Sequence, residues 1–130
     1  MSEKIGLHTL GQISMRAKDV PRAVSFYRDA LGVPLLFEVP EPEMAFFDLD
    51  GVRLMLATPQ GPHDHPGSIL YFTVDDIAAA HEELVARGVL FDTEPTVIAD
   101  MGDHELWMAF FKDSEDNQLA LMSEVAKAPT

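Results

Sequence analysis

The sequence predicts an α+β fold built from two copies of one βαβββ module. An Ala-Phe-Phe strand, a turn and an apolar strand occupy residues 45–56 and return at residues 109–121. Before each copy comes the same plan: an alternating strand, an Asp with a β-branched residue after it, a helical stretch and Gly-Val. Duplicated halves commonly pair about a pseudo-twofold axis, so we expect equivalent positions of both halves to frame a shared cleft.

The first module is predicted over residues 9–59. Residues 12–18 alternate polar and apolar side chains, which is typical of a half-buried strand. Asp19 then caps a helix that has Pro21 in its first turn, and Gly32 ends it. Three strands follow at 35–39, 44–49 and 52–57, the last two joined by a tight turn at Asp50-Gly51.

The second module is predicted over residues 68–124, after a linker at 60–67 that is rich in Pro and Gly. Its first strand spans 68–74, and Asp75 or Asp76 caps a helix that ends at Gly88. Strands are expected at about 90–94, 106–112 and 118–123, with an insertion at 95–105. Neither module can bury both faces of its sheet, so we expect the sheets to meet around the cleft with the helices outside.

Composition narrows the classes of partner. The 130 residues suit one domain, and 9 basic against 22 acidic residues give a net charge of −13, which disfavours nucleic acid and anionic membranes. No apolar run approaches the roughly 20 residues of a membrane span, and residues 1–10 lack the apolar core of a signal peptide, so we expect a cytoplasmic protein. The absence of cysteine excludes disulfides, thiolate catalysis and sulfur-ligated metal.

Two motifs and the module order resemble one known family. The stretch 19–32, the stretch Asp113-Ser114-Glu115-Asp116-Asn117 before the last strand, and βαβββ twice are similar to the vicinal oxygen chelate (VOC) superfamily. That superfamily includes glyoxalase I, bleomycin resistance proteins, methylmalonyl-CoA epimerase and extradiol dioxygenases. The resemblance covers nearly the whole chain. It implies a single glyoxalase-like domain over residues 1–130, a half-open barrel with helices outside, and a homodimer.

The resemblance also implies where a metal would bind. Metal-dependent relatives hold the cation with one residue from the first strand and one from the last strand of each module. The repeat assigns these positions to Gln12, Met55, Ile69 and Ala120, whereas glyoxalase-like enzymes have His or Gln, Glu, His and Glu. One amide oxygen cannot hold a divalent transition metal, and shifting the register by one residue restores no ligand set. We therefore predict no metal and no cofactor.

Strand alternation places further side chains on the same face as these four positions. The mixture of apolar bodies and polar tips is typical of a site for a small organic molecule. Trp107 and the two Phe pairs could add stacking surface, although the Phe pairs fit the core better. The predicted ligand-binding residues are Gln12, Ser14, Arg16, Arg53, Met55, Ile69, Tyr71, Trp107, Gln118, Ala120 and Met122.

The charged candidates each have an alternative interpretation. His104, between Asp103 and Glu105, is the candidate catalytic acid or base, but it could equally be a surface loop histidine. Arg16 and Arg53 could bind a ligand carboxylate or phosphate, or pair with nearby acidic residues. The remaining histidines are predicted to lie in the linker (His63 and His65), on a helix surface (His81) and in an N-terminal arm (His8).

The sequence thus favours a metal-free glyoxalase-like protein that binds a small, partly apolar organic molecule, similar to drug-binding resistance proteins. The acidic charge agrees with a cationic ligand. The alternative is a lyase, isomerase or epimerase that uses His104 with Asp103 or Glu105, and Gln12 or Tyr71 as hydrogen-bond donors. A third class is an interaction module with no ligand. Whether the clefts form within one chain or by exchange of modules in the dimer stays open.

Overall fold

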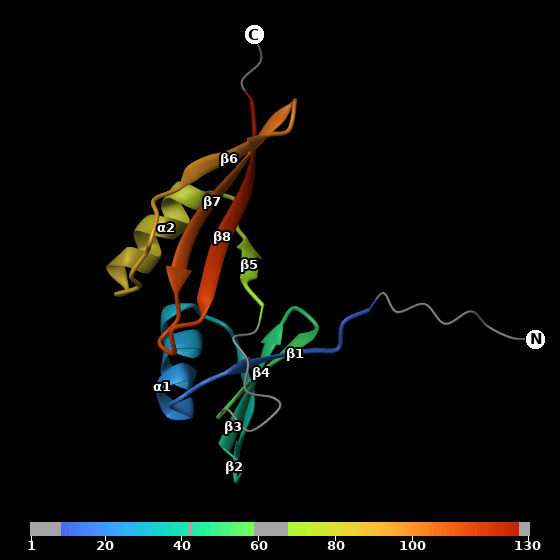
Figure 1. Cartoon of the computed structure of the whole chain (residues 1–130), viewed down its shortest axis with the longest axis vertical. Coiled ribbons are helices and arrows are strands. Elements are labelled where there is room, and N and C mark those ends of the chain that lie inside the picture. Colours follow the sequence, from blue (N-terminus) through green and yellow to red (C-terminus); the bar gives the residue numbers. More distant parts are fainter. Residues whose placement is uncertain (1–8, 42, 59–67, 128–130) are drawn as a thin grey trace, which may run out of the picture.

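The computed structural model describes residues 9–41, 43–58 and 68–127, which form two modules arranged along the long axis of the molecule (Figure 1). Each module has one four-stranded sheet. The elements of module one are β1 (Gln12–Arg16), α1 (Val20–Ser25), the π-helical turn η1 (Phe26–Ala30), β2 (Leu35–Pro40), β3 (Glu43–Leu49) and β4 (Val52–Ala57). The elements of module two are β5 (Leu70–Thr73), α2 (Ile77–Ala86), β6 (Thr96–Asp100), β7 (His104–Lys112) and β8 (Gln118–Ala126).

The two sheets have equivalent topologies. Their strand orders are β1-β4-β3-β2 and β5-β8-β7-β6, and in each the first strand pairs in parallel with the last while the other pairs are antiparallel. Ser14 lies opposite Met55, and Tyr71 lies opposite Ala120 in the same way. The predicted α+β class, the βαβββ order and the equivalence of the two halves are therefore confirmed.

Local sequence explains both helices. The Asp19 carboxylate accepts the Arg22 backbone N–H at 3.0 Å, and the Asp76 carboxylate accepts that of Ala79 at 3.0 Å. These are N-cap bonds, so Asp76 rather than Asp75 begins α2. The first helix widens into η1 and ends at Gly32, whose φ of +74° is a backbone conformation that glycine adopts without strain.

One predicted strand is wrong. We expected a strand at about 90–94 and an insertion at 95–105, but residues 90–94 contribute only an isolated bridge between Phe91 and Phe111. The strand β6 lies inside the expected insertion, because β7 begins at His104 and its first half pairs with β6 across a turn at Gly102. The β8 strand likewise extends to Ala126, past the expected end of module two.

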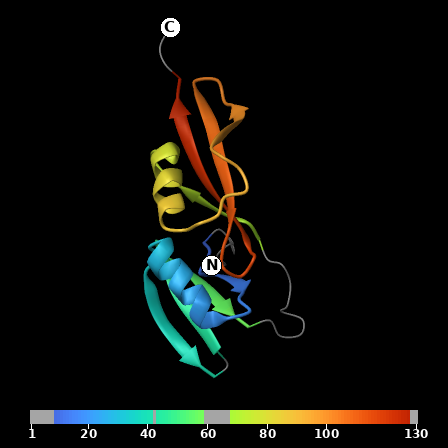
Figure 2. The same cartoon turned by 90° about the vertical axis from the view of Figure 1, so that its left-hand side faces the viewer.

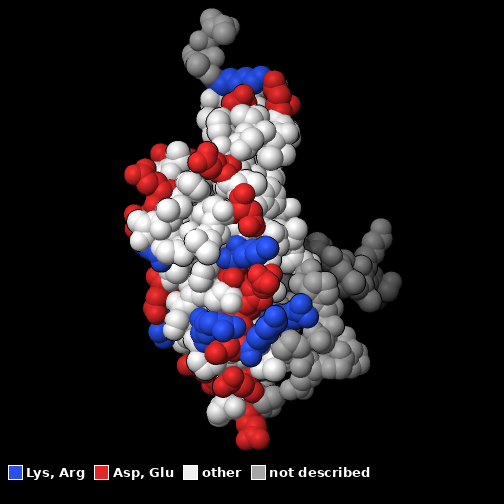
Figure 3. Space-filling model, turned by 60° about the vertical axis from the view of Figure 1, so that its left-hand side comes forward, with Lys and Arg blue, Asp and Glu red and all other residues white. Residues whose placement is uncertain are grey.

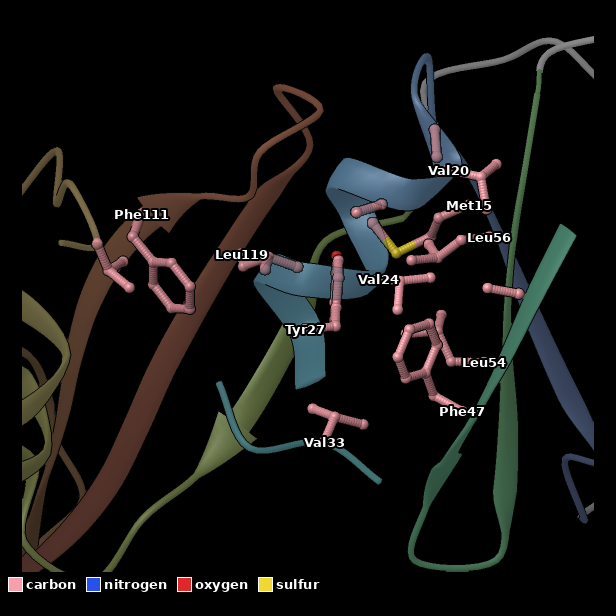
Figure 4. Packing of buried hydrophobic residues seen from close by; sticks show 14 of the residues in the cluster. Met15, Val20, Val24, Tyr27, Val33, Phe47, Leu54, Leu56, Phe111 and Leu119 are labelled. Atoms are coloured by element: carbon pink, nitrogen blue, oxygen red, sulfur yellow. The ribbon is translucent and has the colours of Figure 1, made fainter. Parts of the chain in front are cut away.

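Both helices cover the same side of the molecule, as the views in Figures 1 and 2 show. In module one, the side chains of Val20, Val24 and Tyr27 pack against Met15, Phe47, Leu54 and Leu56 of the sheet (Figure 4). In module two, Phe111, Leu119 and Leu121 are buried with Ile77 of α2. No helix of the described residues covers the opposite side of either sheet, and we call these two sides the open faces.

The modules are joined on the helix side by the loop 113–117 between β7 and β8, which we call the junction loop. The Asp113 carboxylate accepts hydrogen bonds from the Tyr27 hydroxyl at 2.6 Å, from the backbone N–H groups of Glu115 and Asn117, and from the Asn117 side chain. The Asn117 amide also donates to the Arg16 carbonyl at 2.8 Å. Every one of these bonds ties the loop to itself or to module one.

A partly buried ion pair completes the junction. The Arg22 guanidinium binds the Glu115 carboxylate with two nitrogens, at 2.8 and 3.1 Å, and the Asp19 backbone N–H donates to the same carboxylate. The Glu115 side chain is fully buried, whereas that of Arg22 is half exposed. The two sheets share no backbone ladder. This loop, the hydrogen bond from Arg87 to the Ala30 carbonyl and a shared hydrophobic core, rather than edge pairing of strands, hold the described halves together.

Candidate functional site

The open face of sheet one carries most of the polar residues predicted for the ligand site. On β1 and β4, buried Met15, Leu54 and Leu56 point toward α1, so alternation sends their neighbours to the other side. The predicted residues on this open face are Gln12, Ser14, Arg16, Arg53 and Met55. Arg16 is half-buried, and its carbonyl is held by the junction loop.

The centre of this face is a connected group of side chains. The Gln12 carbonyl oxygen accepts the Arg53 Nε–H at 2.8 Å, and the Gln12 amide contacts the Met55 sulfur at 3.8 Å. The Arg53 guanidinium lies over the Phe46 ring, 5.3 Å from its centroid. Phe46 in turn stacks on Phe37, with centroids 4.6 Å apart and planes at 25°. An amide, a cation and two aromatic rings thus form one surface.

The open face of sheet two also has an aromatic group, made by residues of β5 and β7. Tyr71 and Phe110 meet edge to face, 6.2 Å apart, and both are cross-strand neighbours of Ala120. Met122 follows on the same side of β8. Gln118 is engaged in the fold, since its amide donates to the Phe111 carbonyl at 2.9 Å. Ile69, 43% exposed, immediately precedes β5.

The four positions equivalent to the family's metal ligands do not fit a metal. Met55, Ile69 and Ala120 have no nitrogen or oxygen in their side chains. The one suitable atom, the Gln12 carbonyl oxygen, already accepts a hydrogen bond from the cationic Arg53. A divalent ion there would displace that bond and lie beside a positive charge. Among the described residues there is also no group of three or more His, Asp or Glu side chains that could hold a metal ion.

Trp107 lies away from the other predicted ligand-binding residues. It is paired with Ser123, which is buried, and it packs against the hydrophobic core on the helix side. Its indole N–H donates to the Glu105 carboxylate at 3.3 Å. Side chains two residues apart on a strand point to the same face, and Ala109 and Phe111 are both buried in the core. Trp107, two residues before Ala109, therefore points to the core as well.

His104 shares the open side of β7 with Phe110 but stands at the far end of the strand. Six residues of strand separate them, which is about 20 Å at the usual rise. The His104 Nδ1 lies 2.7 Å from Asp103, and this hydrogen bond raises the pKa of His104. Its Nε2 lies 3.5 Å from Glu124 and makes no hydrogen bond in the described part of the chain. The candidate acid and the aromatic group are therefore not brought together.

Of the other histidines, the structure describes only His81. His81 packs edge to face on Phe91, 4.4 Å apart, which makes it a packing residue of α2. His8, His63 and His65 lie outside the described residues.

A groove of about 570 Å³ lies at the junction of the modules, between β5 and the turn joining β3 to β4. Of the predicted ligand-binding residues only Tyr71 lines it, beside Thr73, with Asp48 and Asp50 near its other side. A second, more apolar pocket of about 330 Å³ lies between α2 and η1. These two pockets lie at the module boundary, and Tyr71 alone of the two aromatic groups lines one of them.

Sequence reasoning assigned the Phe pairs to the core, and three of the four rings are buried. Phe47 and Phe111 are fully buried in the core, while Phe46 and Phe110 point to the open faces. The alternation of the strand could have separated them. Phe37 was missed altogether, because a bulge between Leu35 and Phe37 shifts the register of β2 and brings its ring onto Phe46.

Comparison with known proteins matches the sequence and the fold to one family. The sequence model of the Glyoxalase/Bleomycin resistance protein/Dioxygenase superfamily matches residues 9–121. The uncharacterized protein YraH of Bacillus subtilis (strain 168) is 24% identical over 123 residues, which cover 85% of this chain and 94% of that protein.

Solved structures resemble the whole fold. A member of the same superfamily from Sphaerobacter thermophilus DSM 20745 aligns with a TM-score of 0.76 at 22% identity, covering 91% of this chain and 98% of that one. Lactoylglutathione lyase from Agrobacterium tumefaciens aligns with a TM-score of 0.72 at 18% identity, covering 88% and 92%. In the described part of the chain, no helix is long and apolar enough to cross a membrane. The chain belongs to the glyoxalase/bleomycin resistance protein/dioxygenase superfamily.

Proposed function

We propose that this protein binds a small, partly apolar organic molecule against its open sheet faces, without a metal at the four equivalent positions. The observation that carries the proposal is an aromatic group on each open face, with Phe46 and Phe110 at matching positions of the two sheets. Phe46 lies beside Met55 with Phe37 stacked on its other side, and Tyr71 and Phe110 lie beside Ala120. Where metal-dependent relatives hold carboxylates, this chain therefore offers apolar and aromatic surface, which is the usual lining of a small-molecule site.

A second copy of the chain would complete the site. Phe37, Ile69 and Tyr71 are 46, 43 and 45% exposed on the open faces, and apolar surface of this kind is commonly covered by a partner. In a twofold dimer, sheet one of one copy can face sheet two of the other, and symmetry then gives two equal clefts. Because the helices of both modules cover the same side of one chain (Figure 1), the proposal favours clefts formed between the modules of two chains over clefts within one chain.

The lyase or isomerase alternative is not carried further, because it depends on His104. That imidazole stands about 20 Å along β7 from Phe110, at the end of the sheet. A substrate on the aromatic group would not reach it within one chain.

The absence of a structural metal is tested by elemental analysis of the purified, dialysed protein. We expect less than about a tenth of an equivalent of any transition metal, because the donor set cannot hold one. Near-stoichiometric zinc, nickel, manganese or iron that protects against thermal unfolding would overturn the metal-free part of the proposal.

Ligand binding is tested by a thermal-shift screen of aromatic acids, aromatic amines and thiol conjugates, since a ligand raises Tm by mass action. A ligand that raises Tm of the wild-type protein should no longer raise it in Tyr71→Ala or Phe37→Ala. It should still do so in the matched control Leu90→Ala, because Leu90 is an 83% exposed residue that precedes the β6–β7 hairpin. Hits that keep their full shift in both open-face variants would contradict the location of the site.

A further inference from the structure

The open face of sheet one holds a fixed positive charge next to an aromatic platform. The Arg53 guanidinium is positioned by two contacts, the hydrogen bond to Gln12 at 2.8 Å and the stacking on Phe46 at 5.3 Å. Both are contacts that restrict a long side chain before any ligand arrives. Phe37 extends the platform beyond Phe46 with a ring that is 46% exposed.

The position of this cation is unusual for so acidic a chain. The chain has a net charge of −13, and Figure 3 shows acidic side chains spread along the helix-covered side, with basic ones mainly among those of module one. On the strands β1, β3 and β4, alternation places Arg16 and Arg53 on the open face together with a single carboxylate, Asp48. On these three strands, Arg53 is thus a cation on a face that carries one carboxylate.

Asp48 does not neutralise Arg53 in the described structure. The two are cross-strand neighbours, yet no ion pair within 4.0 Å joins them in the described part of the chain. The Asp48 carboxylate instead accepts the Gly51 backbone N–H at 2.9 Å in the turn between β3 and β4. A guanidinium has five N–H donors, and the hydrogen bond to Gln12 uses the Nε–H of Arg53. The fork of its two terminal nitrogens is the part that can bind a carboxylate with two hydrogen bonds.

We propose that the open face of sheet one selects an anionic aryl ligand, with its carboxylate bound by Arg53 and its ring stacked on Phe37. This rests on the proposed function and gives that site a ligand class. It replaces the cationic ligand expected from net charge, because distant surface charges are screened over about 8 Å at physiological ionic strength whereas a contact with Arg53 is not. The acidic surface slows the approach of such a ligand without setting its final affinity.

The test uses three probes of nearly equal shape and different charge: 2-naphthoate, 2-naphthamide and protonated 2-(aminomethyl)naphthalene. Their affinities for the full-length protein are measured by titration calorimetry at 0.15 M salt. We expect 2-naphthoate to bind about tenfold or more tightly than 2-naphthamide, since a charge-assisted hydrogen bond contributes more than a neutral one. The ammonium probe should bind most weakly.

Substitutions test whether Arg53 causes the preference for 2-naphthoate over 2-naphthamide. Arg53→Gln should reduce the naphthoate affinity to that of the amide and leave amide binding within about twofold, and Arg53→Lys should recover only part of the difference because an ammonium lacks the planar fork. Arg28→Gln is the matched control, since Arg28 is an exposed arginine of η1 paired with Asp29. Phe37→Ala should weaken all three probes alike. Each variant is first shown to keep the wild-type Tm within a few degrees.

The outcomes separate the two proposals. Equal binding of the three probes, or tightest binding of the ammonium, overturns the anionic class while the proposed binding function stands. A naphthoate preference that survives in Arg53→Gln overturns the role of Arg53. Failure of all three probes to bind the wild-type protein counts against the proposed function itself.

Discussion

Replacing Tyr27 with Phe should destabilise the protein through the junction loop alone. Tyr27 is fully buried, and Figure 4 shows its side chain between the sheet residues of module one and Leu119 of module two. Its ring packs on Phe26 and Phe47, which Phe at this position would preserve. Only the hydroxyl, with its 2.6 Å hydrogen bond to Asp113, is removed.

The magnitude follows from what Asp113 retains. A hydrogen bond to a charged group contributes about 1.5–3 kcal/mol to stability. The Asp113 carboxylate keeps the N–H donors of Glu115 and Asn117 and the Asn117 amide, so the variant does not leave a bare buried charge. We therefore expect a loss of about 2 kcal/mol in the free energy of unfolding, near the middle of that range.

The assay is equilibrium unfolding in urea followed by Trp107 fluorescence, at one fixed protein concentration because assembly would shift the midpoint. With an m-value of about 2 kcal/mol/M, the midpoint should fall by about 1 M. Tyr71→Phe is the matched control, since Tyr71 is 45% exposed, and its midpoint should move by less than about 0.2 M. A loss below about 0.5 kcal/mol in Tyr27→Phe, or equal losses in both variants, would refute the reasoning.

Three further predictions concern charge and backbone. Burial would raise the pKa of Glu115, but its hydrogen bonds, first among them those from Arg22, outweigh burial and hold the pKa below its usual value. This stabilisation is present above the ordinary carboxyl pKa and lost as the pH falls through the lowered value. Glu115→Gln should therefore cost about 1.5–3 kcal/mol at pH 7 and progressively less in acid, as measured by urea unfolding at several pH values; a constant difference would contradict this. Asp103→Asn should lower the pKa of His104, whose main cause of elevation is the Asp103 hydrogen bond, and an NMR titration that gives equal values for both proteins would exclude that cause. Gly51→Ala should lower stability by about 1 kcal/mol or more, because Gly51 has a φ of +99°; an unchanged Tm would show that the turn tolerates a side chain.

Periodicity and capping residues were sufficient to predict most of the fold. The Asp caps, the Asp50-Gly51 turn and the alternation of the strands are local signals, and the structure follows them at all three places. The strand β6 could not be found in this way. It is paired with the first half of β7, and the length of that hairpin depends on a turn at Gly102 that resembles any other loop in sequence.

For the candidate site, the repeat predicted equivalent positions but not their surroundings. It correctly placed Met55 and Ala120 at matching points of the two sheets. It could not show that Arg53 would be held between Gln12 and Phe46, since those three residues come from three different strands and meet only through the sheet. The core-facing side of Trp107 could have been found from its alternation with Ala109 and Phe111, once Phe111 was assigned to the core.

The motif 113–117 also has a different meaning in the structure from the one its sequence first suggests. It served as a family marker near the last strand, yet its side chains bind the helical segment and β1 of the other module. Such long-range contacts carry no local periodicity. Their only sequence sign is an unusual density of acidic and amide side chains between two apolar strands.

The position of the junction loop affects how the open faces of this protein can evolve. The contacts that hold the halves together are on the helix side, while Gln12, Met55, Ile69 and Ala120 belong to the opposite side. A substitution that alters the ligand surface therefore does not disturb the bonds on which the architecture depends. Selection can exchange ligating side chains for apolar or cationic ones at little cost in folding, which is how one inherited scaffold comes to serve unrelated chemistries.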